Sequence, residues 1–297
     1  MATANSIPDP TLVKPSQRRR WIPLSLRMFL VILLTLGAGS ALWIGVPACR
    51  QWMAIRAIEQ RGGTIETVPK GSRWLPGWAR HPELRIFDRV HAVKLGEHAS
   101  YSTLSEIGVL TDVRTLWLEG APVTDAGLEH LKGLAVLSDL RLGKTPVTDA
   151  GLAHLKPLTR LSFLSLHFTR VTDAGLIHLE GLTNLKHLLL STTLVTDAGF
   201  THLNGLSKLE SLYLENTKVT DAGLIHLQGL KNLTLLSLDN TRVTDAGLEH
   251  LEGLTKLTTL HLLNTQATDA GVAKLKRALP KLTVITQLPS VNRRAAP

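Results

Sequence analysis

The sequence predicts an α/β solenoid, a stack of 24-residue units, with one transmembrane helix before it. Two observations predict the stacked units. A hexapeptide recurs every 24 residues, and the apolar positions keep the same spacing within each period. A third observation, an uncharged run near the N-terminus, predicts the membrane helix. The composition agrees, because 58 of the 297 residues are leucine and a chain with 44% hydrophobic residues can bury a core.

The first elements are a basic tail, residues 1–20, and a membrane anchor, residues 21–47. Residues 28–46 hold no charged side chain over 19 positions, a helix of about 28 Å, which matches the hydrocarbon layer. Five Lys or Arg residues precede this run, against three in the fifteen residues after it. Because the more positive flank stays in the cytoplasm, we expect a cytoplasmic N-terminus. The repeats would then be extracytoplasmic, in the periplasm or at the cell surface.

Two other exported forms fit the same segment. The small residues in Val46-Pro47-Ala48 suit a cleaved secretory signal. Cys49, directly after them, resembles the lipidated cysteine of a bacterial lipoprotein and is a candidate lipidation site. As the single cysteine of the chain, Cys49 also excludes an internal disulfide framework and a multi-cysteine metal cluster.

Residues 48–89 are predicted to form a juxtamembrane stalk and N-terminal cap. Residues 51–60 carry apolar side chains at helical spacing, and Gly62-Gly63 ends that helix. A short strand is expected over residues 64–68, followed by a loop rich in proline and glycine. This segment shows no chemistry-bearing motif.

The repeat domain, residues 90–288, is built on the hexapeptide Val-Thr-Asp-Ala-Gly-Leu. Seven copies, with substitutions in the fourth and the seventh, begin at Val123, Val147, Val171, Val195, Val219, Val243 and Ala267. The leucines that follow are spaced three residues apart, and the last step is two. A spacing of three suits a helix or tight turn, and a spacing of two is strand alternation. Each unit therefore predicts a short helix and a short strand, whose leucines become buried only when units stack.

The residues at the helix ends agree with this assignment. Each hexapeptide places Thr and Asp where an N-cap is expected, and a carboxylate there meets the positive end of the helix dipole. A left-handed glycine is expected to end the helix, at Gly133, Gly181, Gly205, Gly229 and Gly253. Pro157 stands there in the second copy, and its fixed φ predicts a different turn.

The run Leu140-Arg141-Leu142-Gly143-Lys144-Thr145, followed by the hexapeptide at Val147, resembles the leucine-rich repeat. The variety is close to the cysteine-containing and ribonuclease-inhibitor-like subtypes. Where that family carries Asn or Cys this chain has threonine, whose hydroxyl is expected to hydrogen-bond backbone between turns. The combination of an anchor with these repeats is similar to the membrane-anchored, internalin-like repeat proteins of planctomycete-type bacteria.

The resemblance implies a curved solenoid with a parallel sheet on its concave side and short helices on its convex side. The concave face is the usual binding surface of that family. Strand residues between the inward leucines should line it, and they differ from unit to unit, with aromatic residues and arginine that favour protein binding. The candidate partner-binding residues are Trp117, Arg141, Phe163, His167, His187, Tyr213, Glu215, Asp239 and His261.

Two further columns repeat without predicting a metal site. One histidine per unit recurs at His130, His154, His178, His202, His226 and His250. A single imidazole per unit with no paired carboxylate is a poor chelate, so we expect these side chains to pack between helices. The hexapeptide aspartates, Asp125 through Asp269, lack the clustered oxygen ligands of calcium repeats and are expected to cap helices.

Charge distribution and motif content exclude several function classes. Residues 1–122 hold 15 Lys or Arg against 9 Asp or Glu, residues 123–266 hold 12 against 14, and residues 267–297, which end in the basic tail 289–297, hold 6 against 1. The middle therefore lacks the net positive charge of a nucleic-acid binder. Motifs of phosphate-binding loops, zinc proteases and serine hydrolases do not occur, so neither an enzyme nor a cofactor is expected.

The sequence thus predicts a non-catalytic, membrane-anchored repeat protein that binds a protein or a surface polymer on its concave face. One alternative is an intracellular, F-box-like adaptor that selects substrates for ubiquitin-type degradation, since the repeat subtype resembles that of such receptors. The apolar run and the lack of an F-box-like helical segment count against it. A second alternative is a purely structural envelope or spacer protein.

Overall fold

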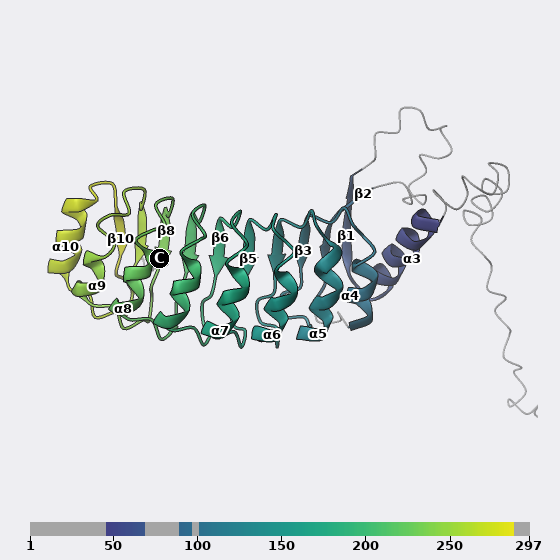
Figure 1. Cartoon of the computed structure of the whole chain (residues 1–297), viewed down its shortest axis with the longest axis horizontal. Coiled ribbons are helices and arrows are strands. Elements are labelled where there is room, and N and C mark those ends of the chain that lie inside the picture. The colour runs from purple at the N-terminus through teal and green to yellow at the C-terminus, as the bar shows by residue number, and fades with distance from the viewer. Residues whose placement is uncertain (1–45, 69–88, 97–100, 288–297) are drawn as a thin grey trace, which may run out of the picture.

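A computed structural model of the chain describes residues 46–68, 89–96 and 101–287. Figure 1 shows an elongated stack of units, with helices along one side and strands along the other. One ten-stranded sheet runs through it in sequence order from β1 to β10. The strands pair in parallel from β2 onward, and β1 alone is antiparallel to its neighbour. The predicted α/β solenoid with a parallel sheet is therefore confirmed.

The N-terminal cap closes one end of the stack. It consists of helix α3 (Val46–Gln60), β1 (Thr64–Val68), β2 (Arg89–Lys94) and α4 (Tyr101–Ile107). The expected helix and strand are present, although the helix begins at Val46 rather than at residue 51. Ile58 of α3 and Leu104 of α4 are fully buried, so the cap shares the core of the repeats.

The predicted membrane span lies outside the described residues, except for its last residue, Val46. Within residues 46–68, 89–96 and 101–287, no helix combines the length and the apolar character needed to cross a membrane.

The repeat units follow the predicted order of short helix and short strand. The strands are β3 (Thr115–Trp117), β4 (Asp139–Arg141), β5 (Phe163–Ser165), β6 (His187–Leu189), β7 (Ser211–Tyr213), β8 (Leu235–Ser237), β9 (Thr259–His261) and β10 (Thr283–Ile285). The α-helices are α5 (Asp125–Leu128), α6 (Asp149–Leu152), α7 (Asp173–Leu176), α8 (Asp221–Leu224), α9 (Asp245–Glu249) and α10 (Asp269–Ala278). The 3-10 helices are η4 (Glu129–Gly133), η5 (Ala153–Leu155), η6 (Ile177–Leu179), η7 (Asp197–Leu203) and η8 (Ile225–Leu227).

The leucines of successive units share one continuous core. All six periodic leucines of the first copy have no solvent-exposed surface: Leu128, Leu131, Leu134, Leu137, Leu140 and Leu142. Their counterparts in later units are equally buried, with exposure rising only slightly toward the C-terminal end. From β3 onward each strand residue pairs with the residue 24 positions later. The sequence period is therefore also the register of the sheet.

The left-handed residue of each unit does not lie where the glycines predict it. It follows the strand instead, at Gly120, Lys144, Phe168, Thr192, Asn216, Asn240 and Asn264, all with φ between 55° and 72°. The glycines that were expected to end the helices do not have a positive φ. Pro157 therefore fits the common turn, in which the Leu158 N–H donates to the Leu155 carbonyl at 2.9 Å, as Leu182 does to Leu179.

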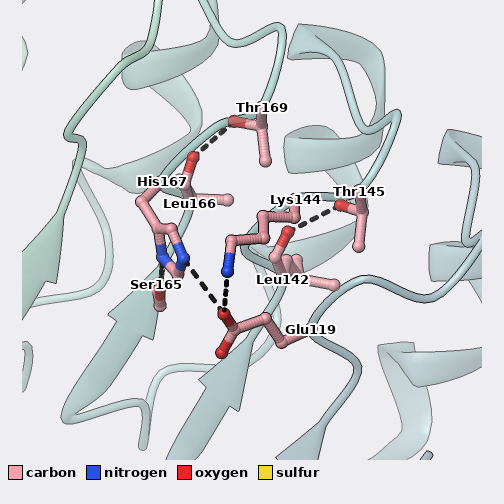
Figure 2. Close-up of polar contacts among 8 residues, drawn as sticks. All are labelled: Glu119, Leu142, Lys144, Thr145, Ser165, Leu166, His167 and Thr169. Carbon is pink, nitrogen blue, oxygen red and sulfur yellow. Dashed lines mark hydrogen bonds and ion pairs between the residues drawn. The ribbon is translucent and has the colours of Figure 1, made fainter. Parts of the chain in front are cut away.

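The repeated threonine bonds within its own turn, not between turns as expected. The Thr145 hydroxyl donates to the Leu142 carbonyl at 2.6 Å, and Thr169 repeats this contact with Leu166, as Figure 2 shows. The left-handed residue just before each threonine reverses the chain and brings the hydroxyl over that carbonyl. The threonine therefore closes the turn that separates strand from helix.

The hexapeptide aspartate bonds to the following unit, and the threonine before it holds the N-cap position. Asp125 Oδ1 accepts from the Thr148 N–H at 2.8 Å, and Asp125 Oδ2 accepts from the Thr148 hydroxyl at 2.6 Å. Six such clamps join the units, and the last one runs from Asp245 to Thr268. A Cβ on Gly151 would lie 2.4 Å from Asp125 Oδ1. Thr, Asp and Gly of the hexapeptide thus serve one inter-unit contact, which corrects the expected capping role of the aspartate.

Candidate functional site

The face of the sheet turned away from the helices, here called the sheet face, carries the predicted binding residues. The register aligns Lys94, Trp117, Arg141 and Ser165 in one row across β2 to β5. A neighbouring row contains Asp139, Phe163 and His187. Side chains from units that are distant in sequence therefore meet at the N-terminal half of the sheet.

Arg141 is the centre of this half. Its Cζ atom lies 4.7 Å from the ring centres of both Trp117 and Phe163. Its Nε and Nη2 atoms donate to Asp139 Oδ1 and Oδ2 at 3.2 and 3.1 Å. Lys94 Nζ lies 5.3 Å from the Trp117 ring. We call Lys94, Trp117, Asp139, Arg141 and Phe163 the Arg–aromatic cluster.

The cluster is held in place before any partner arrives. A bidentate carboxylate fixes the plane of the guanidinium, and two aromatic rings flank it, each cation–π contact being worth about 0.5–1 kcal/mol at an exposed site. The indole N–H of Trp117 is buried and has no hydrogen-bond partner among the described residues. Stacking rather than hydrogen bonding therefore positions that ring.

Two adjoining hollows open beside Trp117. One, of about 280 Å³, is lined in part by His91, Lys94, Trp117 and Asp139. The other, of about 200 Å³, is lined by Lys94, Leu95, Trp117, Glu119 and Arg141. Trp117 and Lys94 line both hollows, so a ligand side chain in either one would lie next to these two residues.

A polar network orients His167 next to this cluster. His167 Nδ1 is 2.7 Å from the Ser165 hydroxyl and Nε2 is 3.3 Å from Glu119 Oε1, which also pairs with Lys144 Nζ at 3.2 Å, as Figure 2 shows. A Cβ on Gly143 would lie 2.1 Å from the His167 ring, so the imidazole packs directly over this backbone.

Glu119 acts as a fixed anion in this network. Partial burial raises the pKa of Glu119, but the hydrogen bond from Lys144 and the nearby charges of His167 and Lys144 outweigh it, and the pKa lies below its ordinary value. The hydroxyl–imidazole–carboxylate order is that of a nucleophile triad. Ser165, however, is only 2% exposed, so the arrangement fixes the His167 ring rather than presenting a nucleophile to a substrate.

His187 on β6 lies beside Phe163, with ring centres 5.8 Å apart. The other four predicted residues, Tyr213, Glu215, Asp239 and His261, lie on or just after β7 to β9. Glu215 accepts a hydrogen bond from the Ser191 hydroxyl. Asp239 Oδ1 accepts from the Leu263 N–H at 2.7 Å, and Asp239 Oδ2 lies 3.8 Å from His261 Nδ1. Burial, followed by the charge of Glu215, raises the pKa of Tyr213. The nine predicted residues thus divide between the two halves of the sheet face.

Phe168 is a site residue that the sequence reasoning missed. Its side chain is 55% exposed, its φ is 55°, and its ring lies edge-on to His167 at 5.8 Å. A bulky side chain in the left-handed region is unfavourable and often marks a functional position. The sequence does contain a signal for Phe168: the equivalent position in the other units is Gly, Lys, Thr or Asn, and only this unit has an aromatic residue there. Lys94 and Asp139 were missed as well, because they act through Trp117 and Arg141.

The histidine column lies on the helix side, and two of its members have polar partners. His202 Nδ1 is 2.7 Å from Glu180 Oε1, and His250 Nδ1 is 3.4 Å from Gln228 Nε2. Burial, helped by the charge of Lys156, lowers the pKa of His178. Within the part of the chain that the structure describes, no three His, Cys, Asp or Glu side chains group as metal ligands would.

Comparison with known proteins supports the fold. No protein-family profile matches the chain, and no curated protein matches it. Among solved structures, the chain is similar to internalin C2 from Listeria monocytogenes str. 4b F2365, with 26% identity and a TM-score of 0.55. The match covers 68% of this chain and 82% of the internalin chain. The architecture is therefore that of a leucine-rich repeat solenoid.

Proposed function

We propose that this chain is a non-catalytic binding protein that holds a partner protein on its sheet face, centred on the Arg–aromatic cluster. The observation that carries the proposal is the placement of Arg141 between Trp117 and Phe163, beside two open hollows. Trp and Arg dominate the binding energy of protein interfaces. The similarity to an internalin, also a repeat protein, is in keeping with this role.

The chemistry of the cluster indicates what the partner presents. Arg141 is already neutralised by Asp139, so the partner would use the ring faces and apolar edges around it. Lys94 lies over the Trp117 ring and has no carboxylate partner among the described residues. We therefore expect the partner to insert an apolar or aromatic side chain beside Trp117 and to place an acidic group at Lys94.

We also propose that residues 28–46 anchor the chain in a membrane with the repeats outside the cytoplasm. The support is the length of the uncharged run and the excess of positive charge before it. Protease added to cells whose outer envelope is permeabilised and whose cytoplasmic membrane is intact should degrade the repeats and leave a short membrane-bound fragment. Repeats that resist protease until the cytoplasmic membrane is opened would favour the intracellular adaptor instead.

Photo-crosslinking in intact cells, followed by affinity recovery, tests the binding face. Each partner recovered with the wild-type chain should then be purified and titrated against Trp117→Ala and against Thr259→Ala, a control on β9 of the same face. Loss of a hot-spot side chain costs about 2 kcal/mol or more, which is about a 30-fold weaker affinity. Equal affinity of wild type and Trp117→Ala for every partner would refute the proposal.

A further inference from the structure

We propose a second, separate binding surface on this molecule, for an acidic glycan. It lies along the edge of the solenoid where the chain enters the strands. We call this surface the basic edge. Its members, each one to four residues before a strand, are Arg114, Arg160, Lys186, Lys208, Lys231 and Lys256. All six side chains are exposed.

Part of the basic edge is hollowed into an open groove of about 340 Å³. Four cations line this groove, Arg114, Arg160, Lys186 and Lys208, and the remaining lining residues are Val136, Ser138, Ser162 and Asn184. Strands of a sheet lie about 4.8 Å apart, so the groove, which runs from the start of β3 to the start of β7, is about 19 Å long. That length suits a chain molecule rather than a single small ion.

The positive charge of the basic edge is largely uncompensated. Lys186 pairs with Glu210 Oε1 at 2.7 Å. None of the other five forms an ion pair among the described residues, although the charge of Lys256 also acts on Glu210 and helps to lower the pKa of that carboxyl. Lys208 and Lys256 donate only to amide oxygens, those of Asn184 and Asn232, both at 2.7 Å.

The opposite edge of the sheet is more acidic than basic. Its acidic residues are Glu119, Glu215, Asp239 and the six clamping aspartates at the helix starts, and they outnumber its cations, which are Lys144, Arg170, Lys218 and Arg242. The nearly neutral charge of the repeats therefore hides a separation of charge across the sheet. A negative ligand would be drawn to one edge and repelled from the other.

The polar pattern of the basic edge selects among polyanions. Along one row the side chains alternate as Arg160, Asn184, Lys208, Asn232 and Lys256, one per unit, so cations recur about every 10 Å with amides between them. The Asn184 and Asn232 amides and the Ser138 and Ser162 hydroxyls already donate to backbone carbonyls. Their oxygens retain acceptor capacity, which suits a polymer that carries hydroxyl groups between its negative charges. The groove has no aromatic lining residue, and single-stranded nucleic acids need such stacking platforms. An acidic glycan fits this chemistry best.

The probe for the test is a size-defined alginate oligomer, a polyuronate, titrated against the full chain in detergent at several salt concentrations. The test variant is Arg114→Gln/Arg160→Gln/Lys208→Gln. The matched control is Arg170→Gln/Lys218→Gln/Arg242→Gln, which removes the same charge from exposed positions on the opposite edge. Thermal unfolding of both variants verifies that they remain folded.

We expect wild type and control to bind alginate, with affinity falling as salt rises. The test variant should bind at least 10-fold more weakly, with a log–log salt slope reduced by about 2, from three lost contacts at about 0.7 each. Neutral dextran should not bind. No alginate binding by wild type, an equal loss in both triple variants, or equally tight binding of a DNA duplex would overturn the inference. Trp117→Ala should retain alginate binding, which separates this result from the fate of the sheet-face proposal.

Discussion

The clamp between neighbouring units can be tested at Asp173. Its Oδ1 accepts from the Thr196 N–H at 2.7 Å and its Oδ2 accepts from the Thr196 hydroxyl at 2.6 Å. The change Asp173→Ala removes both bonds and leaves a partly buried N–H without an acceptor. The equivalent aspartate of the seventh copy, Asp269, is exposed and forms no such clamp within the part of the chain that the structure describes. It therefore provides an internal control with the same place in its helix.

The expected magnitude follows from these contacts. Hydrogen bonds to a charged group contribute about 1.5–3 kcal/mol each, and partial exposure favours the lower end, so Asp173→Ala should cost about 3 kcal/mol. Asp269→Ala loses only the interaction with the helix dipole, about 0.3–1 kcal/mol. The difference between the two variants, about 2 kcal/mol or more, isolates the clamp.

Urea unfolding followed by circular dichroism measures both variants, and an unchanged m-value is required because repeat arrays can lose cooperativity. A double-mutant cycle of Asp173→Ala with Thr196→Val should give a coupling energy of about 1 kcal/mol or more. Gly199→Ala should also destabilise the protein, because its Cβ would lie 2.5 Å from Asp173 Oδ1. If Asp173→Ala and Asp269→Ala differ by less than about 0.5 kcal/mol, the clamp does not hold the units together.

Three further outcomes are expected. The hydroxyl and backbone N–H of Thr268 donate to Asp245 and hold its pKa below the ordinary value. The stability that these bonds contribute is complete at a pH above the ordinary pKa of aspartate. It disappears as the pH falls through the lowered pKa of Asp245. Thr268→Val should therefore raise that pKa, as measured by NMR titration, and an unchanged pKa would contradict the clamp geometry. Glu215→Gln should lower the raised pKa of Tyr213 but leave it above the ordinary value of tyrosine, because burial is the larger cause of the shift. Absorbance titration measures this pKa once the chain's other tyrosine is replaced by phenylalanine. Phe168→Asn should raise the free energy of unfolding by about 1 kcal/mol, because asparagine adopts the left-handed backbone of this position with less strain than phenylalanine. A lower free energy of unfolding in urea would instead show that the contacts of the Phe168 ring stabilise the fold.

The candidate site was predictable only in part. Trp117, Arg141 and Phe163 stand out in the sequence because they interrupt an otherwise regular period. Their sandwich arrangement cannot be seen in the sequence, because Phe163 is two residues away from the row that holds the other two. Only the sheet register brings the two rings and the guanidinium together. The same holds for Asp139 and Lys94, which look like ordinary surface charges until their neighbours are known.

The sequence by itself determined the unit length, the alternation of helix and strand and the buried leucines, and the resemblance to leucine-rich repeats implied the parallel sheet. It could do so because each unit repeats the same local pattern and meets only its immediate neighbours. The tertiary structure decided where the chain turns left-handed, since Lys144, Phe168 and Asn216 occupy that position as well as glycine. It also assigned the hexapeptide aspartate to the next unit and separated the charges onto two edges. These features depend on contacts between side chains about one period apart, and the pattern within a single period does not contain them.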